Sequence, residues 1–132
     1  MSKRQLDALM WAQACAAMER AERLRRQFFH HGTPYWEAPI DIFESDDALI
    51  ILVALPGVEL ETISVTMSAG TLTVTGQRPL PRELENARIV RLEIPHGRFE
   101  RRIELPPAPF ELSGRHLANG CLMLRLEKGS WR

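Results

Sequence analysis

The sequence carries no excess charge of either sign and has few cysteines. Its 132 residues include 17 basic and 17 acidic side chains, so the formal net charge is zero. A neutral chain lacks the clustered Lys and Arg on which nucleic-acid binding depends. The two cysteines, Cys15 and Cys121, are too few and too far apart for a disulfide framework or a zinc site. The composition therefore favours a protein of the reducing cytoplasm.

Long apolar runs and catalytic motifs are also missing. No stretch approaches the roughly 20 apolar residues needed to span a bilayer. The chain contains no Gly-rich phosphate loop, no nucleophile elbow and no His-Glu-x-x-His. His30 and His31 are adjacent and so point in different directions, and the acidic cluster at residues 41–47 is best interpreted as solvated turn residues. We therefore expect a protein that is not an enzyme, with no catalytic, cofactor-binding or metal-binding residues.

Glycine and proline are absent from residues 3–29, which are rich in good helix formers. Ser2 and Gln5 have the spacing of a capping box, and Gly32 to Pro34 would end the helix. Apolar residues recur here at steps of three and four, namely Leu6, Met10, Ala14, Ala17, Ala21, Leu24 and Phe28. The pattern predicts an amphipathic N-terminal helix.

Two interpretations of this helix stay open. It packs on its own domain, or it forms an arm over residues 1–33 for self-assembly or for binding other proteins. At about 1.5 Å per residue the helix is roughly 40 Å long, more than a small sheet domain covers. Residues 1–31 hold six basic and three acidic side chains, a net +3. This charge is modest for a lipid-binding helix, so we expect no membrane contact.

From residue 36 onward the apolar residues follow a β pattern. The run Leu49–Leu55 predicts a strand buried on both faces. Alternation of apolar residues with Ser and Thr on both sides of Ala69-Gly70 predicts a hairpin. We expect further strands over Ile89–Ile94 and Phe99–Leu105, and a last strand after an Asn119-Gly120 turn. Short strands without intervening helices predict a mainly β fold, a β-sandwich.

The segment Gly76–Arg88 is polar, charged and interrupted by Pro79 and Pro81, which predicts a long loop. Loops of this length in compact domains often carry function. The short strand expected at its far end has a position from which it can pair with the sheet of another molecule. The alternative is an ordinary solvated hairpin loop.

The chain from Trp36 to Lys128 resembles the small heat-shock protein, or α-crystallin domain, family of the bacterial and plant type. The matching motifs are Trp36, Pro39, Asp41-Ile42 and Glu44, then "LPGVELETI" (55–63), "GTLTVTGQR" (70–78), "GRFERRIELP" (97–106) and "LANGCLMLRL" (117–126). Their order and spacing together are specific. The resemblance implies an α-crystallin domain over residues 34–128, which is an immunoglobulin-like antiparallel β-sandwich. It also implies an ATP-independent holdase chaperone that binds partly unfolded proteins and prevents their aggregation during stress.

The resemblance also implies which residues form the dimer interface and which bind clients. In this family the long loop carries a strand that pairs with a partner subunit, giving a homodimer or an oligomer of dimers. The dimer-interface residues would be Ile89, Val90, Arg91, Leu92 and Arg101. The surface for clients and assembly would comprise Trp11, Leu24, Phe28, Phe29, Val65 and Leu117.

Two features depart from the family pattern. Arg115 stands where the closing signature usually has Ala. The family continues past its last strand into a tail whose Ile-x-Ile/Val motif docks on a neighbouring subunit, and residues 129–132 do not contain that motif. We therefore expect a dimer, with any larger assembly driven by the N-terminal helix.

Two other functions remain as alternatives. In the first, the chain is an assembly partner that joins or limits the oligomers of a full-length small heat-shock protein. In the second, it is a co-chaperone adaptor resembling a CS domain, which has the same sandwich. The adaptor is disfavoured because those domains lack the Asn-Gly closing signature and the strand-bearing loop.

Overall fold

The computed structural model describes residues 2–30 and 35–129, without the side chains of residue 24 and residues 26–30. Helix α1 (Lys3–His30) begins with the predicted capping box. The Gln5 amide donates to Ser2 Oγ at 3.1 Å, and the Ser2 amide donates to Gln5 Oε1 at 2.9 Å. These two bonds satisfy backbone donors that a helix N-terminus otherwise leaves without partners. The predicted stop at residues 32–34 lies outside the described residues.

The rest of the described chain forms short strands and two single-turn 3₁₀ segments. The strands are β1 (Trp36–Glu37), β2 (Ile40–Glu44), β3 (Ala48–Ala54), β4 (Ser64–Ser68), β5 (Thr71–Arg78), β6 (Gly97–Glu104), β7 (Phe110–Ala118) and β8 (Cys121–Lys128). The 3₁₀ segments are η1 (Leu60–Thr62) and η2 (Arg82–Leu84).

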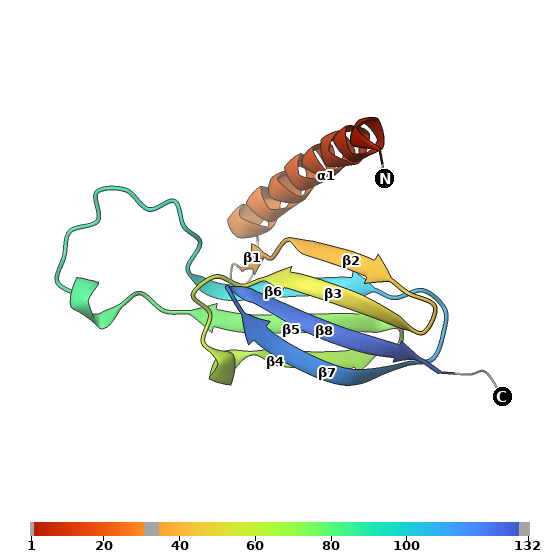
Figure 1. Ribbon diagram of the computed structural model, residues 1–132. Helices are drawn as coiled ribbons and strands as arrows, with labels where there is room; N and C mark the ends of the chain where they lie inside the picture. Colours follow the sequence, from red (N-terminus) through yellow and green to blue (C-terminus); the bar gives the residue numbers. More distant parts are fainter. Residues whose placement is uncertain (1, 31–34, 130–132) are drawn as a thin grey trace.

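The strands form two four-stranded sheets packed face to face (Figure 1). One sheet has the order β1-β6-β5-β4 and the other has the order β2-β3-β8-β7. All pairs are antiparallel except β1 with β6, which is parallel. The predicted mainly β sandwich with an N-terminal helix is confirmed.

The core lies between the sheets, where every second residue of a strand points inward. On β8 the inward residues Leu122, Leu124 and Leu126 are fully buried. Each pairs with a buried residue of β3, for example Leu124 with Ile51. Burying one such side chain stabilises the fold by about 1.5–3 kcal/mol. The sandwich therefore has an apolar core of its own that does not involve α1.

Two tight turns join neighbouring strands at the predicted positions. Ala69-Gly70 joins β4 to β5 with φ values of 51° and 79°, and Asn119-Gly120 joins β7 to β8 with φ values of 54° and 76°. Positive φ at both central residues matches the right-handed twist of hairpin strands, and Gly tolerates it best. Both predicted turns are confirmed.

Two predicted details were wrong. The strand β3 is not buried on both faces: Leu49, Ile51 and Val53 are buried, whereas Ile50 and Leu52 are half-buried. These two face outward from a two-layer sandwich. The long loop begins later than predicted, because β5 continues to Arg78 and pairs there with Gly97. The connection between β5 and β6 therefore runs from residue 79 to residue 96.

Candidate functional site

The loop of residues 79–96 extends away from the sandwich (Figure 1). It carries six exposed large apolar residues: Leu80, Leu84, Ile89, Val90, Leu92 and Ile94. Val90 has the highest exposure of these, at 87%. Several apolar residues left in solvent on one loop indicate a surface that another molecule covers.

The predicted strand over Ile89–Ile94 does not form within this chain. These residues are irregular and have no ladder partner among the described strands. Arg91 and Glu93 form only a long, exposed ion pair, with 3.8 Å between Nε and Oε1. An isolated extended segment has no partner for its backbone N–H and C=O groups, so a strand here requires another sheet edge. The pairing predicted for Ile89, Val90, Arg91 and Leu92 stays a prediction.

Strand β2 offers such an edge. It pairs with β3 on one side, and no other described strand pairs with its outer edge. Ile42 lies opposite the fully buried Ile51 and therefore on the inner face, yet it is 46% exposed. On the outer face Phe43 is exposed too. The sandwich is thus open beside β2, because the facing sheet ends there in the two-residue strand β1.

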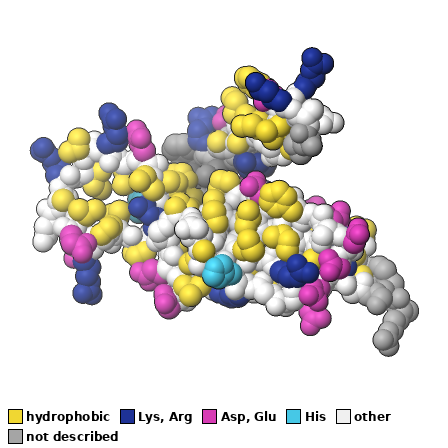
Figure 2. All heavy atoms as spheres, viewed as in Figure 1, with side chains coloured by type: hydrophobic (Ala, Val, Ile, Leu, Met, Phe, Trp, Pro, Cys, Tyr) yellow, Lys and Arg dark blue, Asp and Glu magenta, His cyan; other side chains and the backbone are white. Residues whose placement is uncertain are grey.

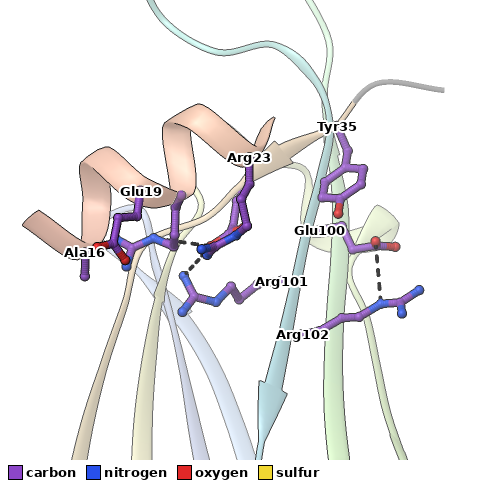
Figure 3. A pocket seen from close by; sticks show the side chains of 9 residues that line it. Ala16, Glu19, Arg23, Tyr35, Glu100, Arg101 and Arg102 are labelled. Atoms are coloured by element: carbon purple, nitrogen blue, oxygen red, sulfur yellow. Dashed lines mark ion pairs between the residues drawn. The ribbon is translucent and has the colours of Figure 1, made fainter. Parts of the chain in front are cut away.

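Charged side chains gather where α1 meets the sandwich, around a cavity of about 310 Å³ (Figure 3). Glu37 Oε1 is 3.2 Å from Arg20 Nε and 3.3 Å from Arg101 Nη1. Arg101 Nη1 also donates to the Ala38 carbonyl at 3.1 Å. One carboxylate therefore connects the helix, β1 and β6. Burial lowers the pKa of Arg101, and the nearby Glu37 partly opposes that shift.

Arg101, a predicted interface residue, is engaged within its own subunit. Its side chain is only 16% exposed. Sequence reasoning missed its partner Glu37 and the second arginine that Glu37 binds, Arg20. The two lie 17 positions apart on different elements, and no spacing rule connects such a pair. The role of Arg101 at an interface stays a prediction.

Among the side chains that the structure describes, the large apolar residues of helix α1 do not pack on the sandwich. The helical residues that line the cavity beside β1 are Ala16, Glu19, Arg20 and Arg23. The large apolar residues of the helix whose side chains are described are exposed, namely Leu6, Leu9, Met10, Trp11 and Met18. Apolar side chains are visible on the projecting helix in Figure 2. Of the two open interpretations, this arrangement favours an arm. The side chains of Leu24, Phe28 and Phe29 lie outside the described residues.

Val65 on β4 and Leu117 on β7 lie on the edge strands at the other side of the sandwich. Both are half-buried and pack against the core cluster. Arg115 Nη2 reaches from β7 to the carbonyl of Ile63, just before β4, at 3.5 Å. The unusual arginine thus spans the two edges, and its backbone keeps the β7–β8 register. The role of Val65 and Leu117 in binding clients stays a prediction.

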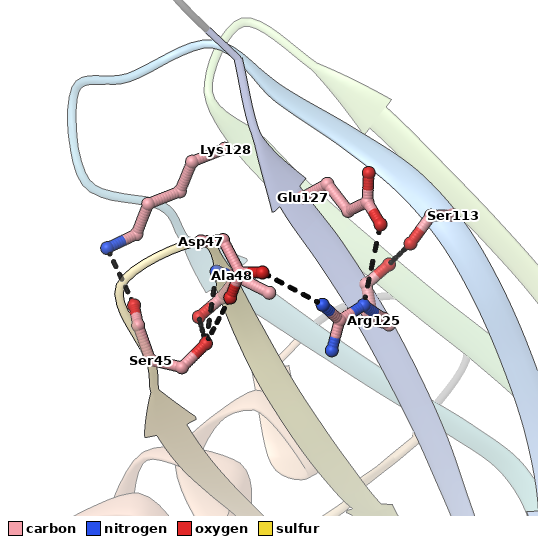
Figure 4. Close-up of polar contacts among 7 residues, drawn as sticks. All are labelled: Ser45, Asp47, Ala48, Ser113, Arg125, Glu127 and Lys128. Carbon is pink, nitrogen blue, oxygen red and sulfur yellow. Dashed lines mark hydrogen bonds and ion pairs between the residues drawn. The ribbon is translucent and has the colours of Figure 1, made fainter.

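Hydrogen bonds of Ser45 with Asp47 and Ala48 stabilise the turn between β2 and β3 (Figure 4). Ser45 Oγ donates to Asp47 Oδ1 at 2.9 Å, and this bond is the main reason that the pKa of Asp47 lies below its usual value. Lys128 Nζ lies 2.9 Å from Glu44 Oε2 and donates to the Ser45 carbonyl.

In residues 2–30 and 35–129 we find no cluster of three His, Cys, Asp or Glu residues arranged to bind a metal. No described helix has the length and apolarity of a membrane span.

Residues 41–131 match the model of the Hsp20/alpha crystallin family. The chain is 36% identical over 93 residues to the 16.9 kDa class I heat shock protein 1 of Triticum aestivum, covering 69% of this chain and 62% of that protein. It is 32% identical over 98 residues to Spore protein SP21 of Stigmatella aurantiaca, covering 74% and 58%. The chain thus spans less than two thirds of the length of these curated relatives.

Solved structures show the same likeness. Heat shock protein 16.0 from Schizosaccharomyces pombe superposes with a TM-score of 0.61 at 30% identity, covering 70% of this chain and 86% of that one. A small heat-shock protein from Xylella fastidiosa superposes with a TM-score of 0.59 at 27% identity, covering 74% and 90%. The Xylella protein has a distinct high order structure.

Proposed function

The chain belongs to the Hsp20/alpha-crystallin family, and from this premise we propose that it is an ATP-independent holdase. It binds partly unfolded proteins through exposed apolar surface and keeps them from aggregating. The family is one of chaperones rather than enzymes. Cys15 and Cys121 are free thiols, which suits the reducing cytoplasm where we propose that the chain acts.

The observation that carries the holdase proposal is the exposed apolar surface of α1. Trp11 is 74% exposed and Met18 is 73% exposed. They lie seven positions apart and hence on one face of the helix. Transfer of apolar area from water contributes about 25 cal/mol per Å², so an unfolded segment that covers this face is held without ATP. Methionine adapts its shape to different partners, which suits unrelated clients.

The active unit that we propose is a strand-exchanged dimer. Residues 89–92 of one subunit pair with the free edge of β2 in its partner, and the partner's loop does the same in return. The edge strand β2 leaves two large apolar residues exposed, Ile42 and Phe43. The edge strand β4 leaves one, Met67, and β7 leaves none. The loop supplies exposed apolar residues of its own, and joining the two would bury both sets. Assembly beyond the dimer would use α1.

Light scattering from a heat-labile enzyme tests the holdase proposal. We expect the chain to suppress scattering at near-equal molar ratio without ATP. The double variant Trp11→Ser, Met18→Ser should require several-fold more chain for the same suppression, because it removes apolar area from α1. The matched control is Leu60→Ser on η1, which is also exposed but lies on the sandwich. Undiminished aggregation at excess wild-type chain would overturn the proposal.

A further inference from the structure

Two side chains hold the segment by which the long loop returns to the sandwich. The ladder between β5 and β6 stops at the pair Arg78 and Gly97. Just beyond it, Arg78 Nη1 donates to the Pro95 carbonyl at 2.8 Å. Trp36 Nε1 donates to the next carbonyl, that of His96, at 2.9 Å. Residues 79–94 of the loop are exposed, whereas Pro95 and His96 are half-buried.

The two donors belong to two different strands. Trp36 belongs to β1 and Arg78 to β5, and these strands flank β6 in the sheet order β1-β6-β5. Proline at position 95 has no N–H to donate to a ladder. The two side chains thus hold the loop where backbone pairing has ended.

The Arg78 side chain is itself confined. A Cβ at Gly57 would lie 2.7 Å from Arg78 Nε, so the arginine packs directly over the glycine backbone. Gly57 also has a φ of 73°, a conformation that side chains disfavour. The turn that follows β3 therefore leaves space for the Arg78 side chain to reach the Pro95 carbonyl.

We propose that Trp36 and Arg78 are positioning residues for strand exchange. By holding two consecutive carbonyls they fix the direction in which residues 89–94 leave the sandwich before any partner binds. A loop whose base is already ordered loses less conformational freedom on pairing, which strengthens the dimer. The inference rests on the proposed dimer.

Sedimentation equilibrium of the full chain tests the inference. Trp36→Phe keeps a ring and removes the donor, and Arg78→Met keeps the alkyl chain and removes the donor. We expect each variant to raise the dimer Kd by about fivefold, the cost of ordering roughly one more residue when the loop pairs. Arg78→Lys keeps a donor and should restore most of the affinity. Hydrogen exchange of the amides at 96 and 97 should be faster in the Phe and Met variants, while exchange in β8 stays unchanged.

Different outcomes overturn different statements. A wild-type chain that stays monomeric at all concentrations overturns the dimer proposal itself. A wild-type dimer whose Kd is unchanged in the Phe and Met variants overturns the positioning role. Faster exchange in β8 with an unchanged Kd would show that the two side chains serve stability alone.

Discussion

The sandwich and its two appendages, α1 and the loop of residues 79–96, use similar apolar residues in opposite ways. In the sandwich, leucines such as Leu124 are fully buried between the sheets. In the appendages, leucines such as Leu9 and Leu92 remain exposed. The stability of the fold therefore depends on the sandwich, while the apolar area of the appendages stays available for other molecules.

The appendages are attached to the sandwich by polar contacts. Glu37 binds Arg20 of the helix, and Trp36, its neighbour on β1, binds the base of the loop. Hydrogen bonds and ion pairs are directional, so they orient an appendage without covering its apolar side chains. The two residues of β1 thus connect both appendages to β6.

The contrast between sandwich and appendages requires that the buried core supply most of the free energy of unfolding. Replacing Leu124 by Ala should lower the free energy of unfolding by about 2–5 kcal/mol, because it leaves a cavity between the sheets. Urea denaturation measures this effect. Met123, the preceding residue on the same strand, is exposed, and Met123→Ala should change stability by less than about 0.5 kcal/mol. Equal losses in the two variants would contradict the assignment of the core.

A charge placed on the exposed loop should affect association rather than folding. Val90→Asp would place an unpaired carboxylate between residues 89–92 and strand β2 of the partner subunit. It should raise the dimer Kd by more than about tenfold. Sedimentation equilibrium measures the change. Ala87→Asp adds the same charge to the same loop outside residues 89–92 and should leave the dimer intact. A Val90→Asp chain that dimerises like the wild type would exclude residues 89–92 from the dimer interface.

Removing the shared carboxylate tests the attachment of α1. Glu37→Gln breaks the ion pairs with Arg20 and Arg101 and should lower the free energy of unfolding by about 1–2 kcal/mol. A fluorophore on the exposed Cys15 should report greater rotational freedom of the helix, measured by anisotropy. Glu22→Gln removes an exposed pair within α1, with Arg25, and is the matched control. Equal anisotropy in wild type and Glu37→Gln would argue against the attachment.

The smallest effect concerns the turn between β2 and β3. The folded state lowers the pKa of Asp47 below 3.8, so the unfolded chain takes up the proton first as the pH falls. The stabilisation is present in full above that value and is lost as the pH falls through the folded pKa. Asp47→Asn should therefore weaken the acid dependence of the urea midpoint slightly. An unchanged profile would show that the Ser45 bond contributes nothing to stability.

Much of the fold follows from local patterns. The capping box, the Ala69-Gly70 and Asn119-Gly120 turns and the alternation along β8 each depend on neighbours within a few residues. The end of β5 was predicted too early, since the ladder with β6 carries it through Gly76 to Arg78. The segment 89–94 has strand-like residues but needs a partner edge, which local pattern does not supply.

The sequence by itself determined the N-terminal helix, the two tight turns at Ala69-Gly70 and Asn119-Gly120, the inward face of β8 and the apolar character of the arm and of residues 89–94. These properties depend on side-chain type and on periods of 2 and 3.6 residues. Only the tertiary structure decided that Glu37 joins Arg20 to Arg101, that Trp36 and Arg78 hold the loop, and that Ile42 remains open to solvent. Such contacts join residues far apart in the chain, and they exist only after the two sheets have packed.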